Sequence, residues 1–233
     1  MTAFEPKVAL IIGAGAGLSA SLARLFARSG MQVALAARRI DKLKALAAET
    51  GAHVFQCDVA DSTSIVRLFE QVEHQLQAPD VLVYNPSARA KGPLTDLDPE
   101  EVKKVIAITA FGGFMAAQQA AKRMLAKGAG AILFTGASAS VKGYPQSAPF
   151  AMGKFALRGL AQSMARELAP QGIHVAHFVI DGAIRSSSLS AGGEADDSML
   201  DPEAIAATYL HVLQQPRSAW TWEVELRPWT ERF

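Results

Sequence analysis

Short apolar runs alternate with longer stretches of helical spacing along the whole chain, and this alternation restricts the fold more than any other feature. The runs of strand length are Lys7–Ile12, Gln32–Ala37, His53–Cys57, Val81–Asn85, Ala131–Thr135, Ile173–Ile180 and Thr221–Leu226. The helical stretches are Leu18–Ser29, Ile40–Thr50, Ser62–Leu76, Pro99–Lys127, Gln146–Ala169 and Pro202–Gln214. Because helical crossovers join parallel strands, the sequence predicts a doubly wound α/β fold: a seven-stranded parallel sheet with helices on both faces.

Length and charge narrow the functional classes. A chain of 233 residues fits one domain, which we expect to span residues 1–233. No apolar run approaches the roughly 20 residues that cross a bilayer, and Met1–Lys7 lacks the pattern of a signal peptide, so we expect a soluble, cytoplasmic protein without a membrane partner. Lysine and arginine number 23 against 22 acidic residues, which makes nucleic acid a poor partner.

Cysteine and histidine give no indication of a metal site. The single cysteine, Cys57, lies in an apolar run and is interpreted as a buried thiol. The closest histidines, His174 and His177, fall on one predicted strand at an odd spacing that sends them to opposite faces. We therefore expect no metal.

A glycine-rich turn follows the first strand and opens the first helix. Gly13, Gly15 and Gly17 allow a tight turn and close approach of a ligand, and the helix that begins at Leu18 offers unpaired N–H groups to a phosphate. A glycine-rich structural turn is the alternative. In this strand-turn-helix context, the pattern favours a Rossmann-like dinucleotide site.

The end of the second strand indicates which dinucleotide binds. About 20 residues after the last glycine, a site for NAD would place an acid for the ribose hydroxyl, but this chain has Arg38 and Arg39. Arginine can donate two hydrogen bonds to a 2′-phosphate. We therefore expect NADP(H) as the cofactor, the alternative being that both arginines are only a solvated strand end.

These motifs resemble those of the short-chain dehydrogenases/reductases. The similarity rests on Gly13-x-x-x-Gly17-Leu18, on Asp58-Val59, on Asn85 and on Lys154, and it extends over nearly the whole chain. The resemblance implies that Asp58 and Val59 contact the adenine, that Asn85 braces the sheet beside the cofactor, and that Lys154 holds the nicotinamide ribose.

Two further features follow from the same resemblance. Ile184 and Ser186 match the segment that contacts the nicotinamide carboxamide. The stretches Pro99–Lys127 and Gln146–Ala169 resemble helices that pair between subunits, which implies a homodimer or homotetramer. Gly112 and Gly113 would let the first of these helices approach its neighbours closely.

The chain departs from the family at its catalytic positions. Phe150 stands where the family has a tyrosine four residues before Lys154. Ala137 stands at the position of the catalytic serine, with Ser138 next to it, and Thr109 stands at the position of the helix asparagine. Outside the catalytic residues, Ser19 replaces a glycine, and Tyr84-Asn85-Pro86-Ser87 replaces an Asn-Asn-Ala-Gly stretch.

The missing tyrosine leaves the proton donor open. Loss of a positioned acid typically costs a factor of about 10² to 10⁴ in rate. The available hydroxyls are Ser138, Ser140, Tyr84 and Tyr144. Tyr144 is the foremost substitute, although a loop aromatic that packs against the sheet is the other interpretation. The catalytic candidates are therefore Lys154, Ser138 and Tyr144.

Three functions are compatible with this pattern. The first is an NADP(H)-dependent oxidoreductase that acts on a carbonyl or a conjugated double bond, with an unidentified small-molecule substrate. The second is a catalytically silent NADP(H)-binding sensor or assembly protein. The third is a structural partner that binds through its apolar helices and through the aromatic tail at residues 220–233, which holds Trp220, Trp222 and Trp229. The tail can equally pack on the chain's own core.

A small, polar segment, Arg185–Leu200, interrupts the alternation before the last helix. A mobile substrate lid and an ordinary exposed connection are both compatible with its composition. Arg185 at its start is a candidate partner for an anionic substrate.

Overall fold

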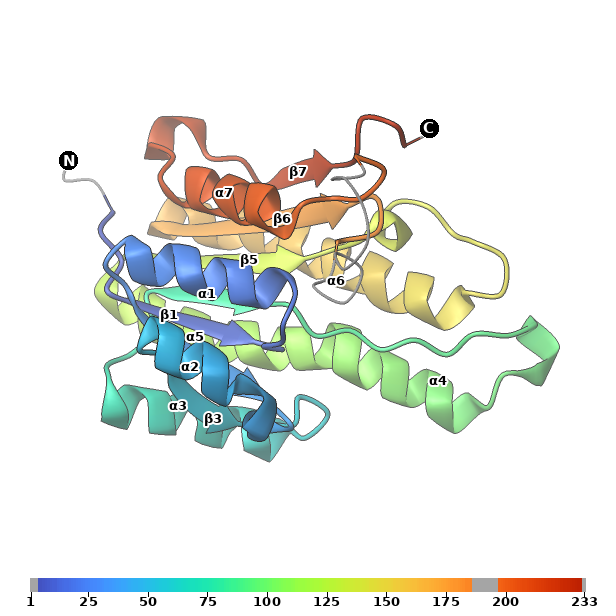
Figure 1. The fold of residues 1–233 in the computed structure, drawn as a ribbon, viewed down its shortest axis with the longest axis horizontal. Helices are drawn as coiled ribbons and strands as arrows, with labels where there is room; N and C mark the ends of the chain where they lie inside the picture. The colour runs from blue at the N-terminus through green and yellow to red at the C-terminus, as the bar shows by residue number, and fades with distance from the viewer. Residues whose placement is uncertain (1–3, 186–196, 232–233) are drawn as a thin grey trace.

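The computed structural model describes residues 4–185 and 197–231, and its centre is one parallel sheet with the strand order β3-β2-β1-β4-β5-β6-β7. The strands are β1 (Val8–Ile12), β2 (Gln32–Ala37), β3 (His53–Gln56), β4 (Val81–Tyr84), β5 (Gly130–Thr135), β6 (Ile173–Ile180) and β7 (Glu223–Leu226). Figure 1 shows the strands running in one direction, as the sequence predicted.

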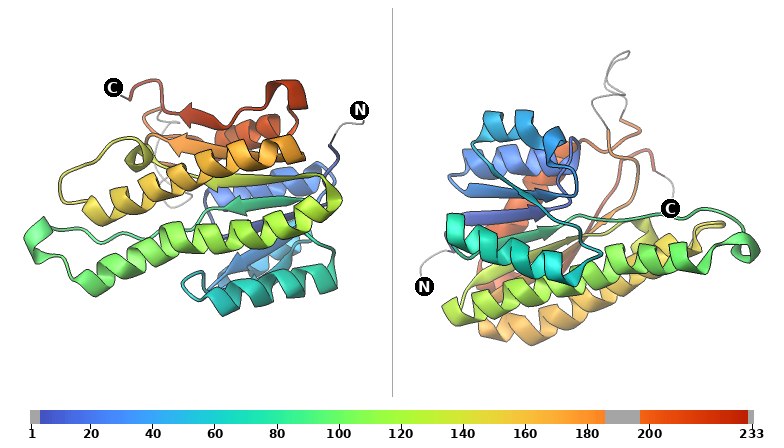
Figure 2. Two further views of the ribbon diagram at one scale, coloured as in Figure 1. Left: turned by 180° about the vertical axis from the view of Figure 1, so that it is seen from behind. Right: turned by 90° about the horizontal axis from the view of Figure 1, so that it is seen from below.

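Helices cover both faces of the sheet and bury a separate apolar cluster on each. They are α1 (Leu18–Arg28), α2 (Lys44–Thr50), α3 (Ser62–Gln75), α4 (Pro99–Ile106), α5 (Gly112–Lys127), α6 (Ala148–Leu168) and α7 (Pro202–Leu213). One cluster joins the sheet to α3, α5 and α6, and the other joins it to α1, α2 and α7. The views from behind and below show these two layers (Figure 2). The doubly wound prediction is confirmed.

The strand order reverses between β1 and β4, whose registers pair Ala9 with Val81 and Ile12 with Tyr84. In such sheets the crevice beyond the carboxyl ends at this reversal is where ligands bind. Figure 1 shows α4 and the first turns of α6 extending past these strand ends.

The predicted helix Pro99–Lys127 is three segments. A π-helical segment, Ala107–Phe111, interrupts it between α4 and α5. Helical periodicity in the sequence does not distinguish this wider turn, which often marks a functional region. Immediately after it, an added Cβ on Gly112 would lie 2.6 Å from the Tyr84 hydroxyl, and one on Gly113 would lie 2.7 Å from Leu157. The two glycines therefore allow the close approach that the sequence predicted.

The C-terminal aromatics divide into two groups. The Trp220 ring stacks on His174 with centroids 4.6 Å apart, and the Trp222 ring lies 5.6 Å from the Arg158 guanidinium carbon. Trp229 is 82% exposed. Two of the three tryptophans thus pack on the chain itself. Within the described residues, no helix is both long enough and apolar enough to span a membrane.

Candidate active site

The turn after β1 is closed against two neighbouring segments. The N–H groups of Gly13 and Ala14 both donate to the Ala36 carbonyl of β2, at 2.9 and 3.0 Å. Gly13 has a φ of +82°, and a Cβ there would lie 2.8 Å from the Pro86 nitrogen. Only glycine meets both requirements without strain.

The other two glycines leave one side of the turn open. An added Cβ on Gly15 or Gly17 would meet no atom of the described chain within 4 Å. Gly17 precedes α1, and no side chain among the described residues caps this helix. Its first N–H groups therefore remain available to an anion, which fits the pyrophosphate of a dinucleotide. The Leu18 side chain is buried in the core, so its backbone is the part that can contact a ligand.

A cleft of about 250 Å³ continues from this turn along the ends of β2 and β3. Gly13, Arg38, Arg39, Asp58 and Val59 all line it, so the structure brings together five residues that the sequence analysis assigned to the cofactor. Arg38 and Arg39 are exposed at the end of β2.

Lys42 lines the same cleft and was missed, since one lysine in an amphipathic stretch has no distinctive sequence signal. The nearest acid in sequence, Asp41, pairs with Lys44 at 2.8 Å. Asp41 therefore forms its ion pair with Lys44, which does not line the cleft, and not with Lys42 or the two arginines.

Asn85 and Ser19 connect the glycine turn to the end of β4. Asn85 Nδ2 donates to Ser19 Oγ at 2.7 Å, and Ser19 Oγ donates to the Gly13 carbonyl at 3.1 Å. The Asn85 N–H also donates to the Ile12 carbonyl at 3.0 Å. Asn85 therefore braces the end of β4 against the glycine turn, and Ser19 supplies the link.

A second cavity of about 550 Å³ lies beyond the carboxyl ends of β4, β5 and β6. It brings together residues from four separate segments: Asn85, Arg89, Ser138, Tyr144, Phe150, Lys154, Asp181 and Ile184. The three catalytic candidates, Lys154, Ser138 and Tyr144, thus face one cavity together with Asn85 and Ile184.

Lys154 is the buried cation of this cavity. Its Nζ donates to the Thr135 carbonyl at 2.7 Å, and the residue is only 2% exposed. Burial lowers the pKa of Lys154 to about 7, with a further contribution from the charge of Arg89. Near neutral pH this amine can therefore both hold and release a proton.

Phe150 lies one turn before Lys154 on α6, and Lys154 Nζ is 6.0 Å from the centre of its ring. The ring is 6% exposed and lines the cavity. Across it lies Arg89, whose guanidinium carbon is 4.2 Å from the ring centre. The apolar ring of Phe150 therefore contacts the Arg89 guanidinium and lies close to the Lys154 amine.

The structure separates the four candidate hydroxyls into two groups. Tyr84 is fully buried and donates to the Ile108 carbonyl, and burial raises its pKa far above the ordinary value. Ser140 is also fully buried. Ser138 and Tyr144 line the cavity, and Tyr144 is 45% exposed. Tyr144 therefore does not have the buried packing against the sheet that was its alternative interpretation.

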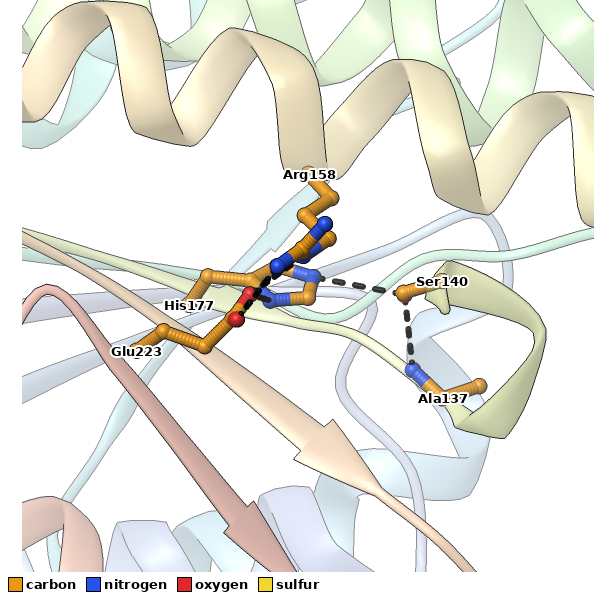
Figure 3. Close-up of polar contacts among 5 residues, drawn as sticks. All are labelled: Ala137, Ser140, Arg158, His177 and Glu223. Carbon is orange, nitrogen blue, oxygen red and sulfur yellow. Dashed lines mark hydrogen bonds and ion pairs between the residues drawn. The ribbon is translucent and has the colours of Figure 1, made fainter. Parts of the chain in front are cut away.

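A buried polar network holds the loop that carries Ser138 (Figure 3). Ala137 N–H donates to Ser140 Oγ at 3.1 Å, and Ser140 Oγ lies 3.3 Å from His177 Nε2. His177 Nδ1 lies 3.1 Å from a Glu223 carboxylate oxygen, and both Glu223 oxygens accept from Arg158 at 2.6 and 2.7 Å.

Burial lowers the pKa of His177 to about 4, although Glu223 acts in the opposite direction. The neutral imidazole then has one consistent set of roles: Nδ1–H donates to Glu223, and Nε2 accepts from the Ser140 hydroxyl. This network was missed because its members are far apart in the sequence. It fixes the backbone on both sides of Ser138.

The segment that follows β6 borders the cavity through Ile180, Gly182, Ala183 and Ile184. Ile184 pairs with Leu200 in a parallel bridge, and Arg185 N–H donates to the Leu200 carbonyl at 2.9 Å. The Arg185 guanidinium pairs with Asp201 at 3.1 Å, so it has a partner within the chain. Ser186 and most of the predicted lid, Arg185–Leu200, lie outside the described residues.

Known proteins are similar to this chain in sequence and fold. A short-chain dehydrogenase from Rhodopseudomonas palustris is 35% identical, with a TM-score of 0.83, and the match covers 96% of this chain and 99% of that one. An alcohol dehydrogenase from Thermococcus sibiricus, solved with 5-hydroxy-NADP, is 26% identical with a TM-score of 0.84 over 97% and 98% of the two chains. An uncharacterised oxidoreductase of Staphylococcus aureus (strain N315) is 26% identical over 231 residues, which are 98% of this chain and 100% of that protein.

Residues 7–192 match the protein family described as short chain dehydrogenase. This match covers most of the chain, including the glycine turn, Asn85 and Lys154. The protein belongs to the short-chain dehydrogenase family of nicotinamide-dependent oxidoreductases.

Proposed function

We propose that the protein is an NADP(H)-dependent oxidoreductase that works without the family's tyrosine. The observation that supports NADP(H) over NAD(H) is the cleft that Arg38, Arg39 and Lys42 share with Gly13 and Asp58. A hydrogen bond from a cation to a phosphate contributes roughly 1.5 to 3 kcal/mol. One such bond to the 2′-phosphate corresponds to a preference of about 10-fold to 100-fold.

Titration of NADPH and NADH into the wild type and into Arg38→Ala and Arg39→Ala tests this preference. We expect the wild type to bind NADPH more tightly, and we expect at least one variant to lose about 10-fold of the ratio. Arg67→Ala, which removes an exposed arginine on α3, is the control. Equal affinities in the wild type would remove the assignment to NADP(H).

The reaction that we propose is reduction of a carbonyl group. NADPH supplies a hydride to the carbonyl carbon when it is bound. Lys154 supplies the proton to the carbonyl oxygen, and its neutral amine then regains a proton from solvent. Its pKa of about 7 is the property that supports this role. Ser138 and Tyr144, which line the same cavity, can donate hydrogen bonds to the substrate oxygen.

Consumption of NADPH with a panel of ketones, aldehydes, quinones and enones tests the activity. We expect turnover of at least one compound, and its loss in Lys154→Met. Ser138→Ala and Tyr144→Phe should reduce turnover less, because neither removes the proton in this scheme. If Tyr144→Phe abolished turnover and Lys154→Met retained it, the proton would be assigned to Tyr144 instead. Tight NADPH binding without any turnover would support the non-catalytic sensor.

A further inference from the structure

Arg89 is a cation on the substrate side of the cavity that no part of the cofactor chemistry uses. It lies after β4 and lines two adjoining spaces: the cavity with Lys154, and a smaller hollow with Lys91, Gln146 and Ser147. Its guanidinium forms no ion pair or hydrogen bond within residues 4–185 and 197–231. Its only close partner there is the face of Phe150.

The loop that carries Arg89 is held at both ends. The N–H of Ala88 donates to Thr109 Oγ1 at 3.2 Å, which links the loop to the π-helical segment. The N–H of Gly92 donates to the Gln146 carbonyl at 3.1 Å, and Gln146 has a φ of +57°, which is uncommon for a residue other than glycine. Arg89 is therefore an exposed side chain on an anchored backbone.

The contact with Phe150 leaves the N–H groups of Arg89 available for hydrogen bonds to a ligand. The guanidinium carbon lies 4.2 Å from the ring centre, and its N–H groups donate no hydrogen bond within the described residues. A tyrosine at position 150 would add a hydroxyl to the ring, whereas the phenylalanine ring is fully apolar. The donors of Arg89 thus remain available to a planar acceptor that enters the cavity, such as a carboxylate.

Among the charges that line the cavity, that of Arg89 has no acidic partner within the described residues. Arg89 and Lys154 line it, and Lys91 lines the adjoining hollow. Of the acids that line it, Asp181 is paired with Lys142 at 3.1 Å, and Glu231 is exposed. Arg89 also lowers the pKa of Lys154 through its charge, and a bound anion would offset that effect.

We propose that Arg89 determines substrate specificity by binding a carboxylate on the substrate, so that the protein reduces carbonyl compounds that carry an acid group. This inference rests on the proposed oxidoreductase function and names the substrate class for it. In this role Phe150 supports Arg89 and packs against the apolar part of the substrate. Arg185, which the sequence suggested for this task, is already paired with Asp201.

Two carbonyl compounds that differ in charge test the proposal. We would compare kcat/KM with NADPH for 4-carboxybenzaldehyde and for its methyl ester, methyl 4-formylbenzoate. We expect the wild type to favour the acid by at least 10-fold. Arg89→Gln should bring the ratio of the two kcat/KM values, acid over ester, close to one, while Arg89→Lys should keep part of the preference; a change in Lys154 acts on both substrates and cancels in this ratio. Arg67→Gln is the control for loss of an exposed arginine.

A binding measurement makes the result independent of turnover. We would titrate benzoate into the protein with and without NADPH and measure heat. We expect binding to the wild type that is at least 10-fold weaker in Arg89→Gln and unchanged in Arg67→Gln. Wild-type protein that binds NADPH and reduces the ester, but neither prefers the acid nor binds benzoate, would overturn the role of Arg89 alone. Failure to bind NADPH would instead overturn the proposed function, and benzoate binding without NADPH would still test Arg89.

Discussion

Phe150 and Lys154 are neighbours on α6, and the chemistry of the cavity depends on this pair. The resemblance of Phe150-x-x-x-Lys154 to the family's motif implies a tyrosine at the first position that would deliver the proton, with its pKa lowered by the lysine. Here the phenylalanine has no proton, while Lys154 is buried with its pKa lowered to about 7. Burial of an amine is a general route to an acid that works near neutral pH.

Restoring the hydroxyl should raise the rate. Phe150→Tyr adds one atom at the edge of a ring that already lines the cavity beside Lys154. We expect kcat/KM for a neutral carbonyl compound to rise by about 10²-fold, the lower end of the usual gain from a positioned acid. Steady-state kinetics with NADPH measure it, with Phe155→Tyr on an exposed part of α6 as the control. An unchanged rate would show that the cavity does not place a substrate oxygen near position 150.

The pH profile identifies the proton donor. If Lys154 gives the proton, only its ammonium form is active in reduction, so the rate falls as pH rises through about 7. We expect this loss in the wild type, measured as kcat/KM for NADPH-dependent reduction across neutral pH. In Phe150→Tyr the new hydroxyl should keep the reduction active at higher pH. A wild-type rate that stays constant from about pH 6 to 9 would exclude Lys154 as the donor.

The loop after β5 is the element that the buried network controls. Ser140 Oγ accepts from the Ala137 N–H of this loop and lies within hydrogen-bond distance of His177. Glu223 of β7 joins His177 to Arg158 of α6. The network therefore connects two strands and a helix at the point where Ser138 enters the cavity. Protonation of His177 would place a charge in this buried network and would reverse its hydrogen bond with Ser140, which would then accept from Nε2–H.

Acid should destabilise the fold through His177. Its pKa is about 4 in the folded chain against an ordinary 6.5, so in this window the unfolded chain binds more protons. The free energy of unfolding should therefore fall by up to about 3 kcal/mol between neutral pH and about pH 4. Urea denaturation at several pH values measures it. His177→Gln should have a shallower slope, by about 1 kcal/mol per pH unit, whereas exposed His53→Gln should not.

The glycine turn is a second element with little tolerance. Gly13 has a positive φ, and a Cβ there would lie 2.8 Å from the backbone nitrogen of Pro86. We expect Gly13→Ala to cost about 1 to 3 kcal/mol of stability and to weaken NADPH binding at least 10-fold. Thermal unfolding and NADPH titration measure these effects. Gly15→Ala meets no clash in the protein, so it should keep wild-type stability while weakening NADPH binding.

At the scale of helices and strands, the features that depend on local sequence patterns could be predicted, and the others could not. Strand and helix positions were predicted because a period of two or 3.6 residues is a local property. The π-helical segment at Ala107–Phe111 was not, since one extra residue in a turn leaves that period almost unchanged. The predicted strand Thr221–Leu226 is shortened to Glu223–Leu226, because Thr221 instead bonds to Gln215.

In the candidate site, too, residues that belong to a local motif could be predicted, and residues that meet only in the folded chain could not. That Gly13, Arg38 and Asp58 line one cleft could be predicted, because a dinucleotide motif lies in one short segment and the strand order places the neighbouring strand ends beside it. Arg89 was not, because its meeting with Phe150 depends on two hydrogen bonds, from Ala88 to Thr109 and from Gly92 to Gln146. His177 appeared only as a strand residue, since its partners come from α6, β7 and the loop after β5.

At the scale of the whole molecule, the outer helices have apolar side chains that the chain itself does not cover. Phe111 and Phe114 stack with centroids 6.0 Å apart and are 51% and 40% exposed. On α6, Met152 and Phe155 are 54% and 45% exposed. Each pair is spaced three residues apart, which places its members on one face of a helix. Figure 2 shows α5 and α6 running side by side in the same layer.

Exposed aromatic and methionine side chains of this size are typical of surfaces that associate. We therefore predict that the protein is a homodimer or homotetramer and that Phe111→Glu with Phe155→Glu converts it to a monomer, because each change buries a charge in the interface. Light scattering after size-exclusion chromatography measures the mass. Ile40→Glu, which adds a charge at an exposed apolar residue before α2, should leave the mass unchanged. A monomeric wild type at micromolar concentration would contradict the prediction, and the four apolar residues would then be ordinary exposed surface.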